Sequence, residues 1–122
     1  MTKRFTKNIA PFVLKEINQA KVARQAGRFD TEFSHLENAH VLGQESTYWH
    51  VKTHGLMLLW ALRHRDIKEC LGQLFRIIGA ATKTAIGLVP KGNTGGSNVS
   101  PFRVMLIKPE HEKIIASAKG VT

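Results

Sequence analysis

Apolar residues recur at three- and four-residue steps along most of the chain, which is the period of one face of an α-helix. Glycines end the first two of these periodic stretches, at Gly27 and Gly43, and aspartates open the second and the fourth, at Asp30 and Asp66. The pattern predicts four long helices and a short one near the C-terminus. Their expected ranges are about 8–26, 30–42, 46–64, 66–87 and 109–118.

Two of the predicted helices have features that bear on packing. The third is apolar nearly all round from Leu56 to Leu62, so we expect it to be the most buried element. The fourth opens with Asp66 and Glu69, which have the spacing of a capping box. Its apolar face, of the kind that packs against a core, consists of Ile67, Leu71, Leu74, Ile78 and Ala81.

The C-terminal third is less regular. Residues 91–101 form a loop rich in glycine and asparagine, which is typical of a flexible surface turn, although such backbone can also cradle an anion. Apolar residues then alternate over 102–108, which predicts an extended segment, either a short strand or a strap over the bundle. The role of the glycine-rich loop 91–100 stays open.

The connections between the predicted helices are short, so consecutive helices should be antiparallel neighbours. A faint repeat of about 37 residues resembles tetratricopeptide hairpins, whose repeat is close to 34 residues. The predicted fold is therefore all-α: a compact bundle of two antiparallel, tetratricopeptide-like helical hairpins with an irregular, loop-rich C-terminal third. Because 122 residues suit one domain, we expect a single helical domain over residues 1–122.

Composition narrows the class of protein. The longest nearly continuous apolar run, residues 55–62, is far shorter than a membrane span, and the basic start of the chain lacks the pattern of a signal peptide. The single cysteine, Cys70, excludes an intramolecular disulfide and fits a reducing compartment. We expect a soluble, cytoplasmic protein without a membrane partner.

The net charge of +9 is unevenly distributed. Residues 1–28 carry +6 and residues 63–122 carry +6, whereas residues 29–62, with four acidic residues and one lysine, carry −3. The acidic stretch also holds four of the six histidines, His35, His40, His50 and His54. Carboxylates and imidazoles in one segment are typical of a cation site, although balanced helix faces give a similar charge pattern.

The spacing of these residues predicts how they meet. His50 and His54 are four residues apart on one predicted helix, so both rings can reach one metal ion. Glu37 and His40 lie near the end of the preceding helix, and the short connection brings the two helix ends together. The predicted metal ligands are therefore Glu37, His40, His50 and His54. Three imidazoles and one carboxylate suit zinc, our first expectation, or cobalt, nickel or iron, and not calcium or magnesium.

Other functions stay open. The four groups can instead be hydrogen-bonded core or surface side chains, and the chain would then be a tetratricopeptide-like protein-interaction module with structural histidines. Non-specific nucleic-acid binding through the basic ends is a third hypothesis. No catalytic residue is assigned, because the segment between His50 and His54 lacks the glutamate of the zinc-protease motif; an enzyme here would be a metal-dependent hydrolase. The oligomeric state and the roles of His35 and His64 are not fixed by the sequence.

Two blocks of the sequence carry a family resemblance: residues 35–44 with 49–51 and His54, and residues 79–90 with 92–96. Together they resemble a small bacterial family of helical proteins, domain of unknown function 3703, over about residues 20–107. The first block contains all four predicted metal ligands. The resemblance implies no activity, because the family is uncharacterised.

Overall fold

The computed structural model describes residues 3–83, 91–97, 99–100 and 103–120. These residues form five helices: α1 (Lys3–Gln25), α2 (Phe29–Gly43), α3 (Thr47–Arg63), α4 (Ile67–Lys83) and α5 (Pro109–Ala118). No strand is present among them, so the predicted all-α fold is confirmed. The last predicted turn of the fourth helix falls in 84–90, outside the described residues.

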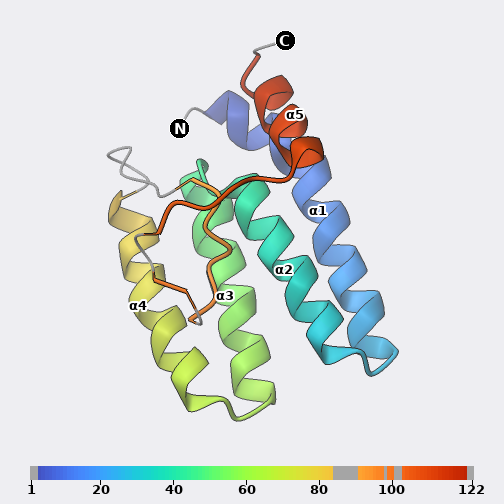
Figure 1. Ribbon diagram of the computed structural model, residues 1–122, viewed down its shortest axis with the longest axis vertical. Helices are drawn as coiled ribbons and strands as arrows, with labels where there is room; N and C mark the ends of the chain where they lie inside the picture. The colour runs from blue at the N-terminus through green and yellow to red at the C-terminus, as the bar shows by residue number, and fades with distance from the viewer. Residues whose placement is uncertain (1–2, 84–90, 98, 101–102, 121–122) are drawn as a thin grey trace.

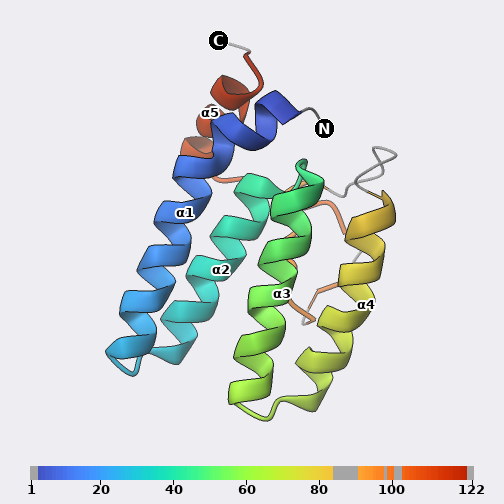
Figure 2. The same cartoon turned by 180° about the vertical axis from the view of Figure 1, so that it is seen from behind.

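The four long helices stand side by side in chain order, and α5 lies against the N-terminal part of α1 (Figure 1). The view from behind shows the same order, with α1 paired to α2 and α3 paired to α4 (Figure 2). Two antiparallel hairpins are therefore present, as predicted, and the ends of α2 and α3 meet at the short connection 44–46. The likeness to tetratricopeptide hairpins stays a prediction.

The helix ends show which sequence signals operate. Ser46 caps α3, because its Oγ accepts a hydrogen bond from Trp49 N at 3.4 Å, and Asp66 Oδ1 caps α4 by accepting one from Glu69 N at 3.0 Å. The prediction that Asp30 caps α2 is wrong, since this helix begins at Phe29 without a side-chain cap. Only half of the predicted capping box forms, because the Glu69 carboxylate binds the loop that follows α4 instead.

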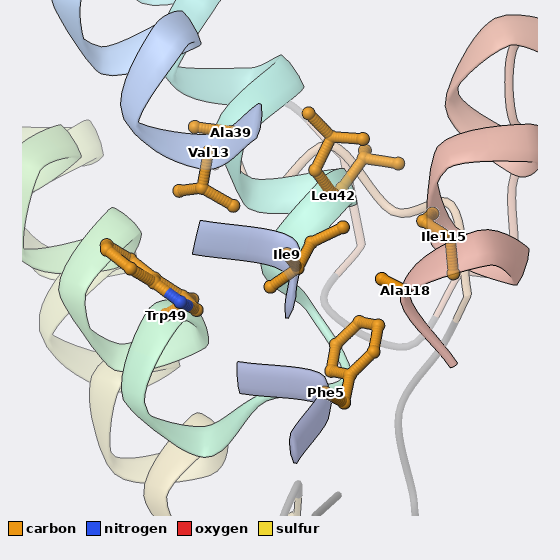
Figure 3. Close-up of a cluster of buried hydrophobic side chains, with 9 residues drawn as sticks. Phe5, Ile9, Val13, Ala39, Leu42, Trp49, Ile115 and Ala118 are labelled. Carbon is orange, nitrogen blue, oxygen red and sulfur yellow. The ribbon is translucent and has the colours of Figure 1, made fainter. Parts of the chain in front are cut away.

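A compact apolar core joins α1, α2, the start of α3 and α5 (Figure 3). Phe5, Ile9 and Val13 line the inner face of α1, one turn apart, and each is almost fully buried. Trp49 of α3 belongs to the same core, and its indole N–H donates a hydrogen bond to the Thr6 carbonyl at 3.0 Å. A second, smaller cluster joins α1, α2 and α3 through Ala20, Leu36 and Met57.

The fourth helix packs the opposite way from the sequence prediction. Its apolar stripe faces solvent: Ile67 is 73% exposed and Ile78 is 70% exposed. The side that faces the protein is polar, with Glu69, Gln73 and Arg76 all buried. The helical period shows which residues share a face, but it does not show which face meets the rest of the protein.

The prediction that the third helix is the most buried element is also wrong, because a larger share of α2 is buried. Leu59 and Leu62 are more than half exposed, whereas His50, Thr53 and His54 are buried. Both helices of the second hairpin therefore turn polar side chains toward the interior.

The glycine-rich segment after residue 90 is not a surface turn. Gly92, Asn93 and Gly95 are buried, and the Asn93 side chain donates hydrogen bonds to the carbonyls of Ser100 and Arg103. Gly92 has a φ of +79°, and a Cβ there would lie 2.0 Å from the Met105 carbonyl oxygen, so this packing requires glycine. Residues 103–108 form no strand and run as a strap toward α5 (Figure 1).

None of the helices in the described ranges is both long and apolar enough to cross a membrane.

Candidate metal centre

Three of the four predicted ligands come together in the interior of the bundle. His40 projects from the last turns of α2, and His50 and His54 lie one turn apart in the first half of α3. One ring nitrogen from each of the three side chains lies within 4.8 Å of the others. His40 is 1% exposed and His54 is 2% exposed, so the cluster is shielded from solvent.

Glu37 does not join this group. It lies one turn before His40 on α2, but its carboxylate accepts a hydrogen bond from the Thr94 side chain. Burial raises the pKa of Glu37 above its ordinary value, and the Thr94 hydrogen bond partly offsets that rise. The geometry therefore ties Glu37 to the glycine-rich loop.

The protonation of two histidine rings follows from their hydrogen-bond partners. His40 Nδ1 lies 2.8 Å from the carbonyl oxygen of Asn93, which can only accept, so Nδ1 carries the proton. His54 Nδ1 lies 2.6 Å from Gln73 Oε1. The Gln73 amide is itself oriented, because its Nε2 donates to the Glu69 carboxylate at 2.6 Å and to the Gly95 carbonyl at 2.8 Å. His54 Nδ1 must therefore also be the donor.

This arrangement leaves two lone pairs facing each other. With both Nδ1 atoms protonated, a neutral His40 and a neutral His54 each carry an unprotonated Nε2, and these two atoms are 3.0 Å apart. Neither nitrogen then has a proton to donate to the other. Such a pair is stabilised by a cation between or beside the two nitrogens, which is either an added proton or a metal ion.

Burial works against the added proton. It lowers the pKa of His50 to about 3, and the neighbouring His54 adds to this effect. It lowers the pKa of His54 to about 4, where the Gln73 hydrogen bond opposes the effect and Arg76 adds to it. Burial likewise lowers the pKa of His40 well below its ordinary value, reinforced by the neighbouring His54 and His50. Near neutral pH the three imidazoles are therefore uncharged, the form in which histidine binds metals.

A cavity of about 40 Å³ adjoins the three histidines. Its wall is completed by Asn93 and by α4, which contributes Phe75, Arg76, Gly79 and Ala80. The loop closes another side of the cluster: Gly95 has a φ of +90°, and a Cβ there would lie 2.8 Å from His40 Cδ2. The backbone thus packs directly on the imidazole ring, which only glycine permits.

Sequence reasoning missed the residues that orient the histidines. Gln73 and Asn93 are single polar residues without a recognisable motif, and Asn93 meets His40 from 53 positions away in the chain. One available signal was the polar face of α4, on which Glu69, Gln73 and Arg76 recur at helical spacing.

The remaining histidines of interest lie outside the cluster. His35 pairs with Glu16 of α1 at 3.1 Å. His64 packs its ring against Phe29 and Trp60, with centroid distances of 4.6 Å and 4.5 Å. Neither ring is placed to share an ion with His40.

Comparison with known proteins agrees with the sequence blocks noted above. The family described as Protein of unknown function (DUF3703) matches residues 7–115. The chain belongs to this family. The match covers the whole histidine cluster, the polar face of α4 and the loop that covers the cluster. No curated protein and no solved structure was found to match the chain.

Proposed function

We propose that this member of the DUF3703 family binds one divalent transition-metal ion through His40, His50 and His54. The observation that carries the proposal is the pair of Nε2 atoms 3.0 Å apart, both left without a proton by the acceptors on Nδ1. Metal-binding histidines commonly donate their second ring N–H to a carbonyl or carboxylate in this way. The role would be metal handling or stabilisation of the fold.

Zinc is the ion we propose first. Imidazole nitrogens suit zinc, cobalt, nickel and iron, and three protein ligands with one open position are a common zinc arrangement. Glu37, the fourth ligand predicted from the sequence, is not part of the group of three histidines, and its carboxylate accepts a hydrogen bond from Thr94. We therefore assign it to holding the loop over the site.

The test is metal content and metal binding in protein purified without a histidine tag. We expect about one equivalent of zinc or cobalt per chain by elemental analysis after loading and dialysis, and a large loss of binding in His54→Ala and in His50→Ala. His64→Ala is the matched control, because this ring lies outside the cluster, and it should keep the wild-type stoichiometry. Wild-type protein that ignores zinc, cobalt and nickel would contradict the proposal.

The exposed face of α4 favours a second candidate, a protein-interaction module. Ile67, Leu71 and Ile78 are each more than 60% exposed on one helix side, and exposed apolar patches commonly mark interaction sites. Binding of a partner that survives a chelator and His54→Ala, and that is lost in Leu71→Glu, would favour this function. If removal of the metal also abolishes partner binding, the metal site and the interaction surface would instead serve one function.

A further inference from the structure

Arg76 shares the cavity with the three histidines and has an unused donor. The side chain lies on the inner face of α4 and is 8% exposed. Its Nη1 donates to the Gly72 carbonyl at 3.1 Å, and its Nη2 donates to the Val99 carbonyl. Its Nε atom is buried and has no hydrogen-bond partner among the residues that the structure describes. A buried N–H without a partner is costly, which points to a ligand that the protein alone does not supply.

The charges around the cavity also call for a ligand of negative sign. The three imidazoles are neutral when they bind a metal, so a divalent ion and the Arg76 guanidinium place three positive charges close together. Arg76 lines the same cavity as His40 and His54, and its charge lowers the pKa of both rings. Glu69 is the carboxylate that favours the charged Arg76, and its oxygens already accept hydrogen bonds from Gln73 and Ser97. The Glu69 carboxylate offsets only part of this positive charge, and the excess that remains is unfavourable in a buried site.

We propose that the metal ion keeps one coordination position open toward this cavity, and that a small monovalent anion occupies it and accepts a hydrogen bond from Arg76 Nε–H. The proposal rests on the metal binding proposed above and adds a ligand class to it. One bound anion would both offset the local positive charge and accept the hydrogen bond that Arg76 Nε–H can donate. Zinc bound by three histidines commonly takes a fourth, exogenous ligand in this way.

The size of the cavity limits the anion. A volume of about 40 Å³ holds on the order of three water-sized atoms, at roughly 10–15 Å³ for each. Hydroxide, a halide, azide and formate meet this limit, whereas an anion with an aromatic ring does not. Phe75 and Gly79 of α4 line the same cavity.

The experiment uses the full-length protein loaded with Co²⁺, whose visible absorption reports the ligands of the ion. Azide is the probe and benzoate is the oversized control. We expect azide to change the spectrum with a saturable, single-site response, and benzoate at the same concentration to leave it unchanged. Arg76→Lys should bind Co²⁺ as the wild type does but bind azide about tenfold or more weakly, as expected for the loss of a hydrogen bond to a charged group. Arg103→Lys, an exposed arginine, is the matched control and should show wild-type azide binding.

The outcomes separate this proposal from the metal proposal. Absence of cobalt bands in the wild type overturns both. Normal cobalt bands that do not respond to azide, that respond equally to benzoate, or that give the same azide affinity in Arg76→Lys overturn the anion proposal alone. If circular dichroism shows that Arg76→Lys does not fold, the comparison of azide with benzoate in the wild type still decides the question.

Discussion

The interior of this protein is built in two ways. Around α1, α2 and α5 the buried side chains are apolar, with Phe5, Ile9 and Val13 at the centre. Between α2, α3, α4 and the loop that follows α4, they are polar, and His40, His54 and Gln73 are among the most buried side chains of the described residues. The first region is stabilised by burial of apolar area, which has no directional requirement. The stability of the second region depends on hydrogen-bond partners for its buried polar groups.

The contrast is sharpest on α4, where the usual arrangement of a surface helix is reversed. Leu71 faces solvent and Gln73, two residues later, is fully buried. A polar interior of this kind contributes less to stability than an apolar one of the same volume, because each polar group must first be desolvated. This difference between the two regions indicates that the second hairpin is arranged around the histidine cluster. The apolar core supplies the stability of the fold that holds the cluster in place.

The largest expected effect comes from the apolar region. Phe5→Ala should lower the free energy of unfolding by about 3–5 kcal/mol, because it leaves a cavity at a site that is 2% exposed. Urea denaturation measures the change. The folded fraction should still bind metal, since Phe5 lies outside the histidine cluster; metal binding that disappears in the folded variant would mean that the two regions are not separable.

Low pH should lower the stability of the protein through the buried histidines of the polar region. The folded pKa of His50 is about 3 and that of His54 is about 4, below the ordinary value near 6.5, so the unfolded chain binds more protons between these limits. The contribution to stability is therefore complete above pH 6.5 and is lost as pH falls toward 4 for His54 and toward 3 for His50. Because an unfolded histidine is only half protonated at pH 6.5, each group contributes about 1 kcal/mol between pH 6.5 and 5.5, which gives roughly 2 kcal/mol for the pair.

Urea midpoints of metal-free protein at these two pH values test this prediction. His50→Ala and His54→Ala should flatten the pH dependence, provided that each variant folds at pH 7.5. A wild-type midpoint that does not change over this window would show that the histidines are already charged in the folded protein.

Two substitutions on α4, one on its buried polar face and one on its exposed apolar face, test the reversed packing of this helix. Gln73→Leu removes the acceptor of His54 Nδ1 and a donor to Glu69, so it should cost about 2 kcal/mol although it adds apolar surface. It should also weaken metal binding roughly tenfold or more, because His54 loses its orientation. Leu71→Gln, on the exposed face, should change stability by less than about 0.5 kcal/mol. Equal effects of the two changes on urea midpoints would contradict the reversed packing of α4.

The loop offers a smaller test. Gly95→Ala and Gly27→Ala place the same side chain at φ values of +90° and +73°, but only at Gly95 would the new Cβ meet a neighbour, the His40 ring. Gly27→Ala should cost about 1 kcal/mol for backbone strain, and Gly95→Ala should cost roughly 1 kcal/mol more. Only Gly95→Ala should also weaken metal binding. If the two variants lose the same amount of thermal stability and of metal affinity, the loop does not pack against the histidine cluster.

Much of this fold is predictable from the sequence, because periodic apolar residues and short connections are local signals. The bounds of α2 and α3 fall within one residue of the prediction, and α1 begins five residues earlier than expected. The convergence of His40, His50 and His54 also follows from helical spacing and a short connection. All of these inferences use residues that are close together in the chain.

The features that the sequence does not reveal depend on distant contacts. The exposure of Leu71 depends on which face of α4 meets α3, and no local pattern decides this. Asn93 and Gly95 look like turn residues, yet they contact His40 across more than 50 positions. Glu37 has the right spacing for a ligand, but Thr94 of the same loop takes its carboxylate.

The central claim is that hydrogen bonds from Nδ1 leave the Nε2 atoms of His40 and His54 free for one metal ion. Long-range ¹H–¹⁵N correlation spectra of the histidine rings test it most directly, with His40→Gln and His54→Gln used for assignment. We predict that both rings carry their proton on Nδ1 at pH 7.5, and that one equivalent of Zn²⁺ shifts both Nε2 resonances. Protonated Nε2 atoms, or Nε2 resonances that ignore zinc, would contradict the claim.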